Sequence, residues 1–189
     1  MTPIAVTLVF AVALVASLAT QLWLTTRQMR HVARHRQSVP APFAATVTLQ
    51  AHRRAADYTL AKGRFGVLQA AVGAAVVVGW TLLGGLDALN AVLLERVHAP
   101  FGPMTYQLAL VGAFALIGGL VDLPFAWWSV FRIEQRFGFN RMSLALWLTD
   151  LAKAAAVGAA VGLPLVALVL WLMSAAGAWW WLWAWLAWM

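Results

Sequence analysis

The sequence predicts an all-α protein, a polytopic helical membrane bundle with four complete transmembrane helices and the start of a fifth. Three observations lead to this class. Of the 189 residues, 63% are hydrophobic and only 10% are charged, whereas soluble domains have about 25% charged residues. Several stretches with almost no charge reach the roughly 20 residues that a helix needs to cross a bilayer. The basic residues are concentrated in alternate connections between these stretches.

The first stretch has to be distinguished from a secretory signal peptide. It begins Met-Thr-Pro-Ile, without the basic residue of a signal peptide, and its apolar run is too long, so we expect a retained span. The third stretch carries one acid, Asp122, followed by Pro124. No charged residue follows Lys153, and this long tail divides at Ser174-Ala-Ala-Gly177. In chain order the expected spans cover residues 3–26, 66–86, 104–131, 154–173 and 179–189.

The last of these spans is too short to cross a bilayer. Eleven residues of helix rise about 16 Å, half the thickness of the hydrocarbon core. Six of the eleven are Trp, which is typical of the interfacial belt where a helix enters the membrane. We therefore expect the helix to continue beyond Met189 and the sequence to be an excerpt of a longer chain.

The distribution of Lys and Arg predicts the orientation in the membrane. Eight of the 13 basic residues lie between the first and second spans, one between the second and third, four between the third and fourth, and none after the fourth. Cytoplasmic loops carry the excess of basic residues, so the N-terminus is expected outside and the two basic loops in the cytoplasm. The net charge of +7 is then a consequence of topology. Membrane lipid is the expected partner, and nucleic acid is not.

The first basic loop offers two further candidates. From residue 44, apolar side chains recur at helical spacing as far as Tyr58, which predicts either an amphipathic helix on anionic lipid or one wall of a functional chamber. His31 and His35 are four residues apart, but Val32 stands where a zinc-protease helix would need the Glu that acts as general base, and Arg34 places a cation beside the two imidazoles. We therefore expect no metal site there. The absence of cysteine excludes disulfides, thiolate zinc sites and a cysteine nucleophile.

Two features inside the spans allow other functions. Asp122 is costly in hydrocarbon and should face the bundle interior or a basic partner. We favour a structural role, with Pro124 bending the helix, over the alternative of a small membrane transporter or channel subunit that uses Asp122 as a relay. Gly158 and Gly162 form a G-x-x-x-G pattern, which allows close helix packing. This packing is expected inside the bundle, and a homodimer seam in an assembly subunit is the alternative.

Three segments carry a resemblance to a known family. They are Asp122-Leu-Pro-Phe125 followed by Val130-Phe-Arg-Ile-Glu-Gln-Arg-Phe-Gly-Phe-Asn140, then Ala55-Ala-Asp-Tyr-Thr-Leu-Ala-Lys62 with Arg64-Phe65, and Gly84-Gly-Leu-Asp87. Together they resemble the N-terminal membrane domain of the CAAX prenyl protease type 1 family, which are membrane-embedded zinc metallopeptidases. The resemblance covers about residues 20–189. Trp128 replaces the family's usual Tyr, and Gln135 replaces its second Glu.

The resemblance implies a helical bundle around a hydrated chamber, with zinc on the cytoplasmic side. In that family H-E-x-x-H and a downstream Glu hold the zinc, and residues 1–189 contain no H-E-x-x-H. Residues 1–189 would thus be an N-terminal transmembrane domain that is inactive alone and binds no zinc. The catalytic half would follow residue 189 and would be a partner, together with a peptide or protein substrate.

The resemblance also bears on substrate and location. In the eukaryotic branch it implies removal of the terminal tripeptide from prenylated CAAX proteins in the endoplasmic reticulum. The lack of cysteine and the Ala-, Val- and Arg-rich composition favour a bacterial member in the inner membrane that acts in the turnover of membrane proteins.

The loop after the third span contains several residues whose chemistry predicts a defined backbone conformation. Gly138 can adopt a positive φ, Asn140 can hydrogen-bond nearby backbone, and Ser143 precedes a helical pattern. One interpretation is that Glu134, Arg136 and Asn140 only cap and solvate a helix end. We favour the hypothesis that Glu134 and Asn140 position this loop against the catalytic half without touching the metal.

Overall fold

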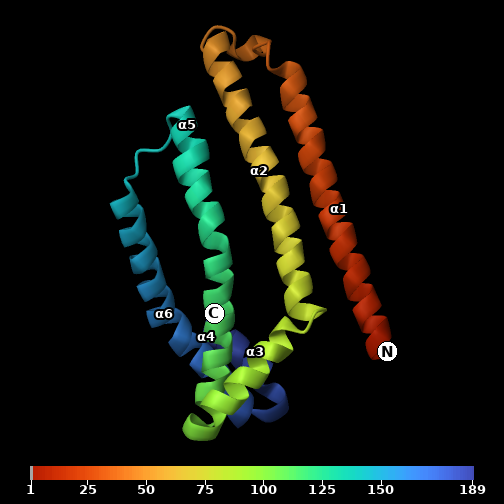
Figure 1. Cartoon of the computed structure of the whole chain (residues 1–189), viewed down its shortest axis with the longest axis vertical. Helices are drawn as coiled ribbons and strands as arrows, with labels where there is room; N and C mark the ends of the chain where they lie inside the picture. Colours follow the sequence, from red (N-terminus) through yellow and green to blue (C-terminus); the bar gives the residue numbers. More distant parts are fainter. Residues whose placement is uncertain (1) are drawn as a thin grey trace. The chain divides into compact units, whose positions relative to one another are not determined.

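The structure is a computed structural model that describes residues 2–189, without the side chains of Ala178, Ala187 and Trp188. The described residues form helices and no strand, and four helical stretches are long and apolar enough to cross a membrane. The predicted all-α membrane fold is therefore confirmed. In chain order the helices are α1 (Pro3–His35), η1 (Ala41–Phe43), α2 (Leu49–Thr81), α3 (Gly85–Leu93), η2 (Leu94–His98), α4 (Ala99–Trp128), η3 (Ser129–Glu134), α5 (Gln135–Phe137), α6 (Leu144–Ala175), η4 (Gly177–Trp179) and α7 (Trp180–Trp188) (Figure 1).

The chain divides into two compact units. The first consists of Met1–Gly84 and Pro124–Arg141, and the second of Gly85–Leu123 and Met142–Met189. The four-residue end of α4 that follows Pro124 therefore belongs, with η3 and α5, to the unit built on α1 and α2. Each unit is described separately below.

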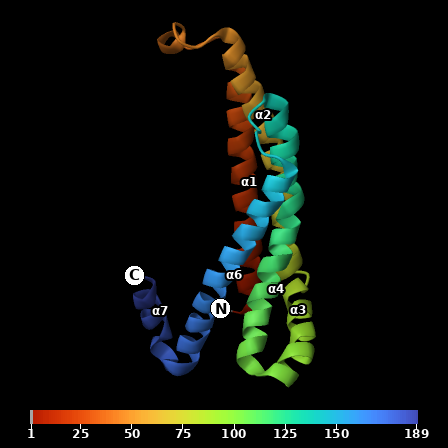
Figure 2. The ribbon, with the colours of Figure 1, turned by 90° about the vertical axis from the view of Figure 1, so that its left-hand side faces the viewer.

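In the first unit α1 and α2 run antiparallel, side by side (Figures 1 and 2). Each begins at a threonine whose hydroxyl accepts a hydrogen bond from a backbone amide: Thr2 from Ala5 N at 3.3 Å and Thr48 from Ala51 N at 3.2 Å. Such caps satisfy amides that have no partner inside the helix. The chain reverses between α1 and α2 where Pro40 precedes the short 3₁₀ helix η1.

The predicted amphipathic segment does not form a separate helix on the membrane surface. From Leu49 it is the first part of α2, which continues without a break to Thr81. The segment is continuous with the span because the prolines and the capping threonine all precede Leu49, and nothing between Tyr58 and Gly66 interrupts helical hydrogen bonding.

The α1–α2 contact combines close backbone packing with polar pairs. A Cβ placed on Gly63 would lie 2.8 Å from Met29 Cγ and Sδ, so the absence of a side chain permits this approach. Nearer the loop, Arg36 donates to Asp57 at 2.7 Å, with both side chains 38% exposed. The hydrogen bond to Asp57 and the charge of that carboxylate raise the pKa of Arg36 above its usual value, so the guanidinium stays charged.

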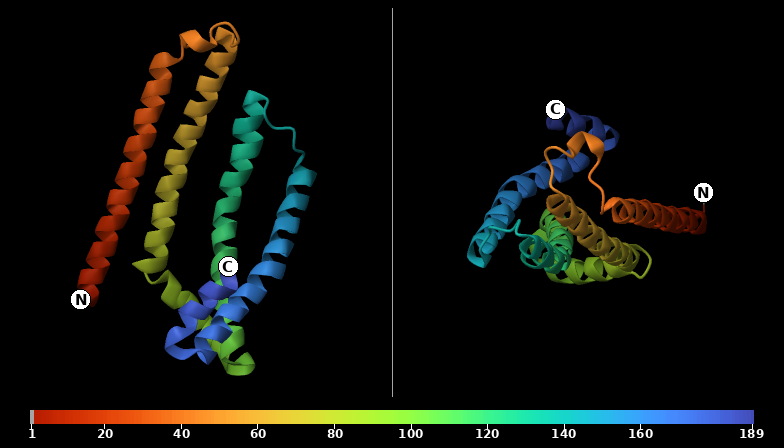
Figure 3. Two further views of the ribbon diagram at one scale, coloured as in Figure 1. Left: turned by 180° about the vertical axis from the view of Figure 1, so that it is seen from behind. Right: turned by 90° about the horizontal axis from the view of Figure 1, so that it is seen from above.

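The second unit contains the other two long helices. In α4 the backbone is interrupted at Gly102, with φ 82° and ψ 176°, immediately before Pro103. The hydroxyl of Ser143 caps α6 by accepting from Leu146 N at 3.2 Å. After α6 the chain turns at Gly177, with φ 54°, and α7 folds back against α6 (Figure 3).

Candidate functional site

The loop singled out in the sequence begins with a specific helix ending. Gly138 has φ 74° and ψ 21°, the left-handed conformation, at the end of α5. The amide of Phe139 donates to Glu134 O at 2.9 Å and the amide of Gly138 to Gln135 O at 3.0 Å. This pair of bonds is a Schellman motif. The amide of Asn140 also reaches Glu134 O, at 3.3 Å, so the turn is closed by three backbone hydrogen bonds.

Before this turn the helix widens into the π-helix η3, which carries two polar side chains to one neighbour. Lys62 Nζ of α2 donates to Ser129 Oγ at 2.8 Å and to Glu134 Oε1 at 3.0 Å. Positions five apart on an α-helix differ by about 1.4 turns and face different directions. Because a π-helix bonds residue i to i+5, its wider turn brings Ser129 and Glu134 to the same side. The Lys62 and Glu134 side chains are 37% and 29% exposed.

Aromatic packing surrounds this ion pair. The ring of Tyr58, one turn before Lys62 on α2, meets the rings of Phe137 and Phe139 edge-on, with centroids 5.5 and 4.9 Å away. Lys62 Nζ lies 5.8 Å from the Tyr58 ring centroid. Ile133, one of the two most buried apolar residues that the structure describes, is 7% exposed. Edge-to-face aromatic pairs contribute about 0.5–1.5 kcal/mol each beyond buried area.

Arg54 completes the site by capping the helix end. Its Nη2 donates to the carbonyl of Phe137, a cation placed at a helix C-terminus, where the helix dipole favours positive charge. A Cβ on Gly138 would lie 2.7 Å from this Nη2. We call the set of side chains from α2, η3 and the following turn the Lys62 cluster; it consists of Arg54, Tyr58, Lys62, Ser129, Glu134, Phe137 and Phe139.

The contacts of the Lys62 cluster join the turn after η3 to α2. Lys62 and Glu134 neutralise each other, and Arg54 is occupied by a backbone carbonyl. An open cavity of about 440 Å³ lies beside it, lined by the start of α2 and by Phe137, Gly138 and Phe139. No side chain around this cavity is arranged as a nucleophile with an adjacent base, which is the pattern that covalent catalysis requires.

Sequence reasoning identified one half of this site. Glu134, Gly138 and Asn140 were singled out, and the structure places all three in the turn, with Asn140 half-buried. Arg136 is exposed, with its guanidinium carbon 5.9 Å from the Phe137 ring.

The residues that α2 contributes to this site were not predicted. Tyr58 and Lys62 lie in a segment that matched the family, but no role was assigned to them. The available signal was their spacing with Phe65, at positions i, i+4 and i+7 on one face of a helix; Phe65 itself packs on Phe125 with centroids 5.9 Å apart.

The remaining candidates lie outside the Lys62 cluster. Asp122 is exposed on α4, in the second unit, and the helix continues through Pro124 to Trp128. Gly158 is exposed and Gly162 half-buried on α6, and within the described part of their own unit nothing lies within 4 Å of a Cβ built on either. The described residues of the second unit thus show no helix seated on the G-x-x-x-G face.

The described residues offer no grouped ligands for a zinc ion. Among residues 2–189, no three His, Asp or Glu side chains are grouped so that they could hold a metal. The rings of His31 and His35 are 4.3 Å apart, and His35 Nδ1 donates to the carbonyl of His31 at 2.9 Å. His52 Nε2 donates to the carbonyl of His35 at 3.0 Å. These imidazoles serve the α1–α2 connection.

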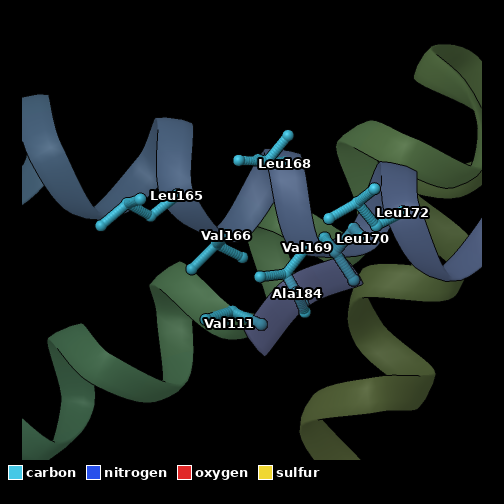
Figure 4. A pocket seen from close by; sticks show the side chains of 8 residues that line it. All are labelled: Val111, Leu165, Val166, Leu168, Val169, Leu170, Leu172 and Ala184. Atoms are coloured by element: carbon cyan, nitrogen blue, oxygen red, sulfur yellow. The ribbon is translucent and has the colours of Figure 1, made fainter. Parts of the chain in front are cut away.

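The second unit contains an open cavity of about 390 Å³ lined by aliphatic side chains (Figure 4). Val111 from α4 and Ala184 from α7 face the aliphatic side chains of α6, which include Val166 and Val169. The side chains around this cavity form no hydrogen bond or ion pair with one another, whereas the Lys62 cluster combines an ion pair with hydrogen bonds between α2 and η3 and is therefore the stronger candidate.

Comparison with known proteins gives one family. Residues 28–189 match the family described as CAAX prenyl protease N-terminal, five membrane helices. CAAX prenyl protease 1 of Saccharomyces cerevisiae is 36% identical over 85 residues, which are 45% of this chain and 18% of that protein. The human CAAX prenyl protease 1 homolog is 26% identical over 189 residues, covering 94% of this chain and 39% of that protein.

A solved structure has the same fold. The crystal structure of S. mikatae Ste24p matches with a TM-score of 0.80 and 22% sequence identity, over 88% of this chain and 39% of that one. The chain therefore spans at most about two-fifths of the length of these three proteins.

Proposed function

Because the chain belongs to the family of CAAX prenyl protease N-terminal domains with five membrane helices, we propose that it is the non-catalytic membrane part of an integral membrane zinc metalloendopeptidase. The full-length protein that would contain it is called the parent protein below. The observation that carries the proposal is the family match over residues 28–189. In this proposal the helices form the wall and substrate entrance of a proteolytic chamber. The zinc and the residues that activate water belong to the rest of the parent protein.

The Lys62 cluster suggests how this part contributes to activity. The side chains of Tyr58 and Lys62 hold the turn that contains Glu134, Arg136, Gly138 and Asn140 at one end of the first unit. We propose that this turn is the surface that positions the catalytic half of the parent protein. Pro124, in the last part of α4 that belongs to the same unit, would support it. The comparisons do not favour the alternative of a small transporter that uses Asp122.

The parent protein should hydrolyse peptides in a metal-dependent way. Purified in detergent, it is incubated with a prenylated CAAX peptide and with an unprenylated peptide of the same sequence. A zinc chelator should abolish hydrolysis and added Zn²⁺ should restore it, because the metal polarises the peptide carbonyl and activates water. Hydrolysis that survives complete zinc removal would refute the proposal. The preference between the two peptides tests a second proposal, made from the composition, that the protein is bacterial, lies in the inner membrane and takes unprenylated substrates.

We propose that the chain lies in the membrane with the basic ends of its helices in the cytoplasm. Single cysteines can be placed in this cysteine-free segment without background from residues 1–189. In intact cells, cysteines at Ser38 and Ser143 should be shielded from a membrane-impermeant maleimide, whereas one at Ala99 should react. All three should react after the membrane is dissolved in detergent. Labelling of Ser38 in intact cells would reverse the orientation.

A further inference from the structure

The outer face of α1 carries a basic groove near the C-terminal end of the helix. Trp23, Arg27, Arg30 and Arg34 are spaced by four, three and four residues, so they form one row along the helix. All four side chains are exposed. A second row with His31 and His35 runs beside the first, and the two rows line a cavity of about 670 Å³ that belongs to α1 alone. We call this surface the α1 groove.

Packing within the first unit involves the histidine row of the α1 groove, where the carbonyl of His35 accepts from His52, but not the arginine row. The side of α1 that meets α2 is the one that carries Met29, packed against Gly63, and Arg36, paired with Asp57. The salt bridges of the described residues involve Arg36 and Lys62. Arg27, Arg30 and Arg34 therefore have no carboxylate partner among residues 2–189, and three positive charges remain available to an anion.

The position of the α1 groove along the helix indicates where this anion would come from. Residues 1–26 carry no charged side chain, so the arginines begin where an apolar span ends. Trp23 stands at this boundary, with the Arg27 guanidinium carbon 5.6 Å from its ring centroid. An aromatic residue and arginines at such a boundary are typical of the headgroup level of a bilayer. Toward the N-terminus the same helix exposes Val12 and Val15, each at 67%, along a path for acyl chains.

We infer that the α1 groove binds the headgroup of an anionic phospholipid. The phosphodiester lies between Arg27, Arg30 and Arg34, where guanidinium donors form charge-assisted hydrogen bonds with phosphate oxygens. The acyl chains run along α1 toward Val15. Trp23 holds Arg27 at the level of the phosphate. A zwitterionic lipid brings its own cation and leaves the charge of the three arginines uncompensated, so the groove selects lipids with a net negative charge.

The test measures lipid binding to the purified parent protein by native mass spectrometry, with phosphatidylglycerol and phosphatidylcholine as probes. The variant Arg27→Gln/Arg30→Gln/Arg34→Gln should bind phosphatidylglycerol at least about tenfold more weakly than the wild type, because each basic residue near an anionic surface contributes several-fold to affinity. Its binding of phosphatidylcholine should not change. Trp23→Leu should give a smaller loss of phosphatidylglycerol, because it removes the support of Arg27 alone.

The matched control removes three positive charges elsewhere. Arg64, Arg141 and Lys153 are exposed and outside the α1 groove, so the variant Arg64→Gln/Arg141→Gln/Lys153→Gln should keep wild-type binding. Equal losses in the two triple variants would overturn the inference, because net charge would then explain the binding. It would also be overturned if inorganic phosphate competed as well as the lipid, which would make the groove a site for free anions.

A second measurement tests whether protein covers the α1 groove instead. A cysteine at Gln28, which lines the groove in the same row as His31 and His35, should react with maleimide in detergent and be protected when phosphatidylglycerol is added. Protection without lipid would mean that another part of the parent protein or a second copy occupies the groove, and the inference would fail. None of these measurements uses proteolysis, so their outcome is independent of the proposed function.

Discussion

Replacing Glu134 by Lys in the parent protein should lower kcat/KM for peptide hydrolysis by about tenfold or more, while zinc content and membrane insertion stay unchanged. The substitution removes the carboxylate that lies 3.0 Å from Lys62 Nζ and places a second ammonium beside the first. Both groups are partly exposed, so the lost attraction alone is worth about 1 kcal/mol or less. The larger effect comes from repulsion, which separates η3 from α2 and displaces the turn that follows.

A charge swap distinguishes this geometry from a general loss of stability. Lys62→Glu combined with Glu134→Lys restores an ion pair and should recover most of the activity, with a coupling free energy of about 0.5–3 kcal/mol in the double-mutant cycle. Gln135→Lys adds a positive charge at the neighbouring exposed position and serves as the matched control, with activity close to wild type. If the activity of the charge-swap variant is no higher than that of the less active single variant, the ion pair does not position the turn.

Gly138→Ala should open the same turn from its other end. A residue with a Cβ in the left-handed conformation costs roughly 1–2 kcal/mol, and the new Cβ would meet Arg54 Nη2 at 2.7 Å. Arg54 must then leave the Phe137 carbonyl, which it caps. The amides of Phe139 and Asn140, both bonded to Glu134 O, should exchange hydrogen about five- to thirtyfold faster because the turn opens more often, and peptide hydrolysis should fall as well.

The control for this variant is another glycine in the same unit. Gly66 lies inside α2, and nothing comes within 4 Å of a Cβ built on it. Gly66→Ala should therefore leave the turn unaffected and stabilise α2 by up to about 1 kcal/mol, since Ala is the better helix former. Unchanged exchange at Phe139 in Gly138→Ala would show that the left-handed glycine is dispensable.

The class of the fold and the ends of several elements could be predicted from local sequence. The all-helical membrane architecture follows from long runs without charge, because unpaired backbone groups are too costly in hydrocarbon for any other arrangement of such segments. The helix cap at Ser143 and the positive φ of Gly138 follow from short-range chemistry, which a sequence shows directly. The resemblance to the family could also be identified from local sequence, because the motifs that carry it are contiguous.

The contacts between residues far apart in the chain could not be predicted from local sequence. Lys62 and Glu134 are 72 positions apart, and along the sequence Lys62 was one of eight basic residues that set the topology. Its role depends on which face α2 turns toward η3, and on the π-helix that brings Ser129 and Glu134 together. Neither is encoded in a local pattern, because both result from the packing of two helices.

The difference between local sequence and tertiary packing also explains what could be predicted for the segment before the second span. Its helical periodicity was recognised from sequence, whereas its union with the membrane helix into one α2 of 33 residues was not. An amphipathic face is equally suited to lipid headgroups and to a neighbouring helix. The choice was made by α1, which packs along α2 and provides Arg36 for Asp57 and the His35 carbonyl for His52. The sequence thus specifies where helices form and which face of each helix is apolar. Tertiary packing decides what covers that face, because the free energy of burial depends on a second surface that lies elsewhere in the chain.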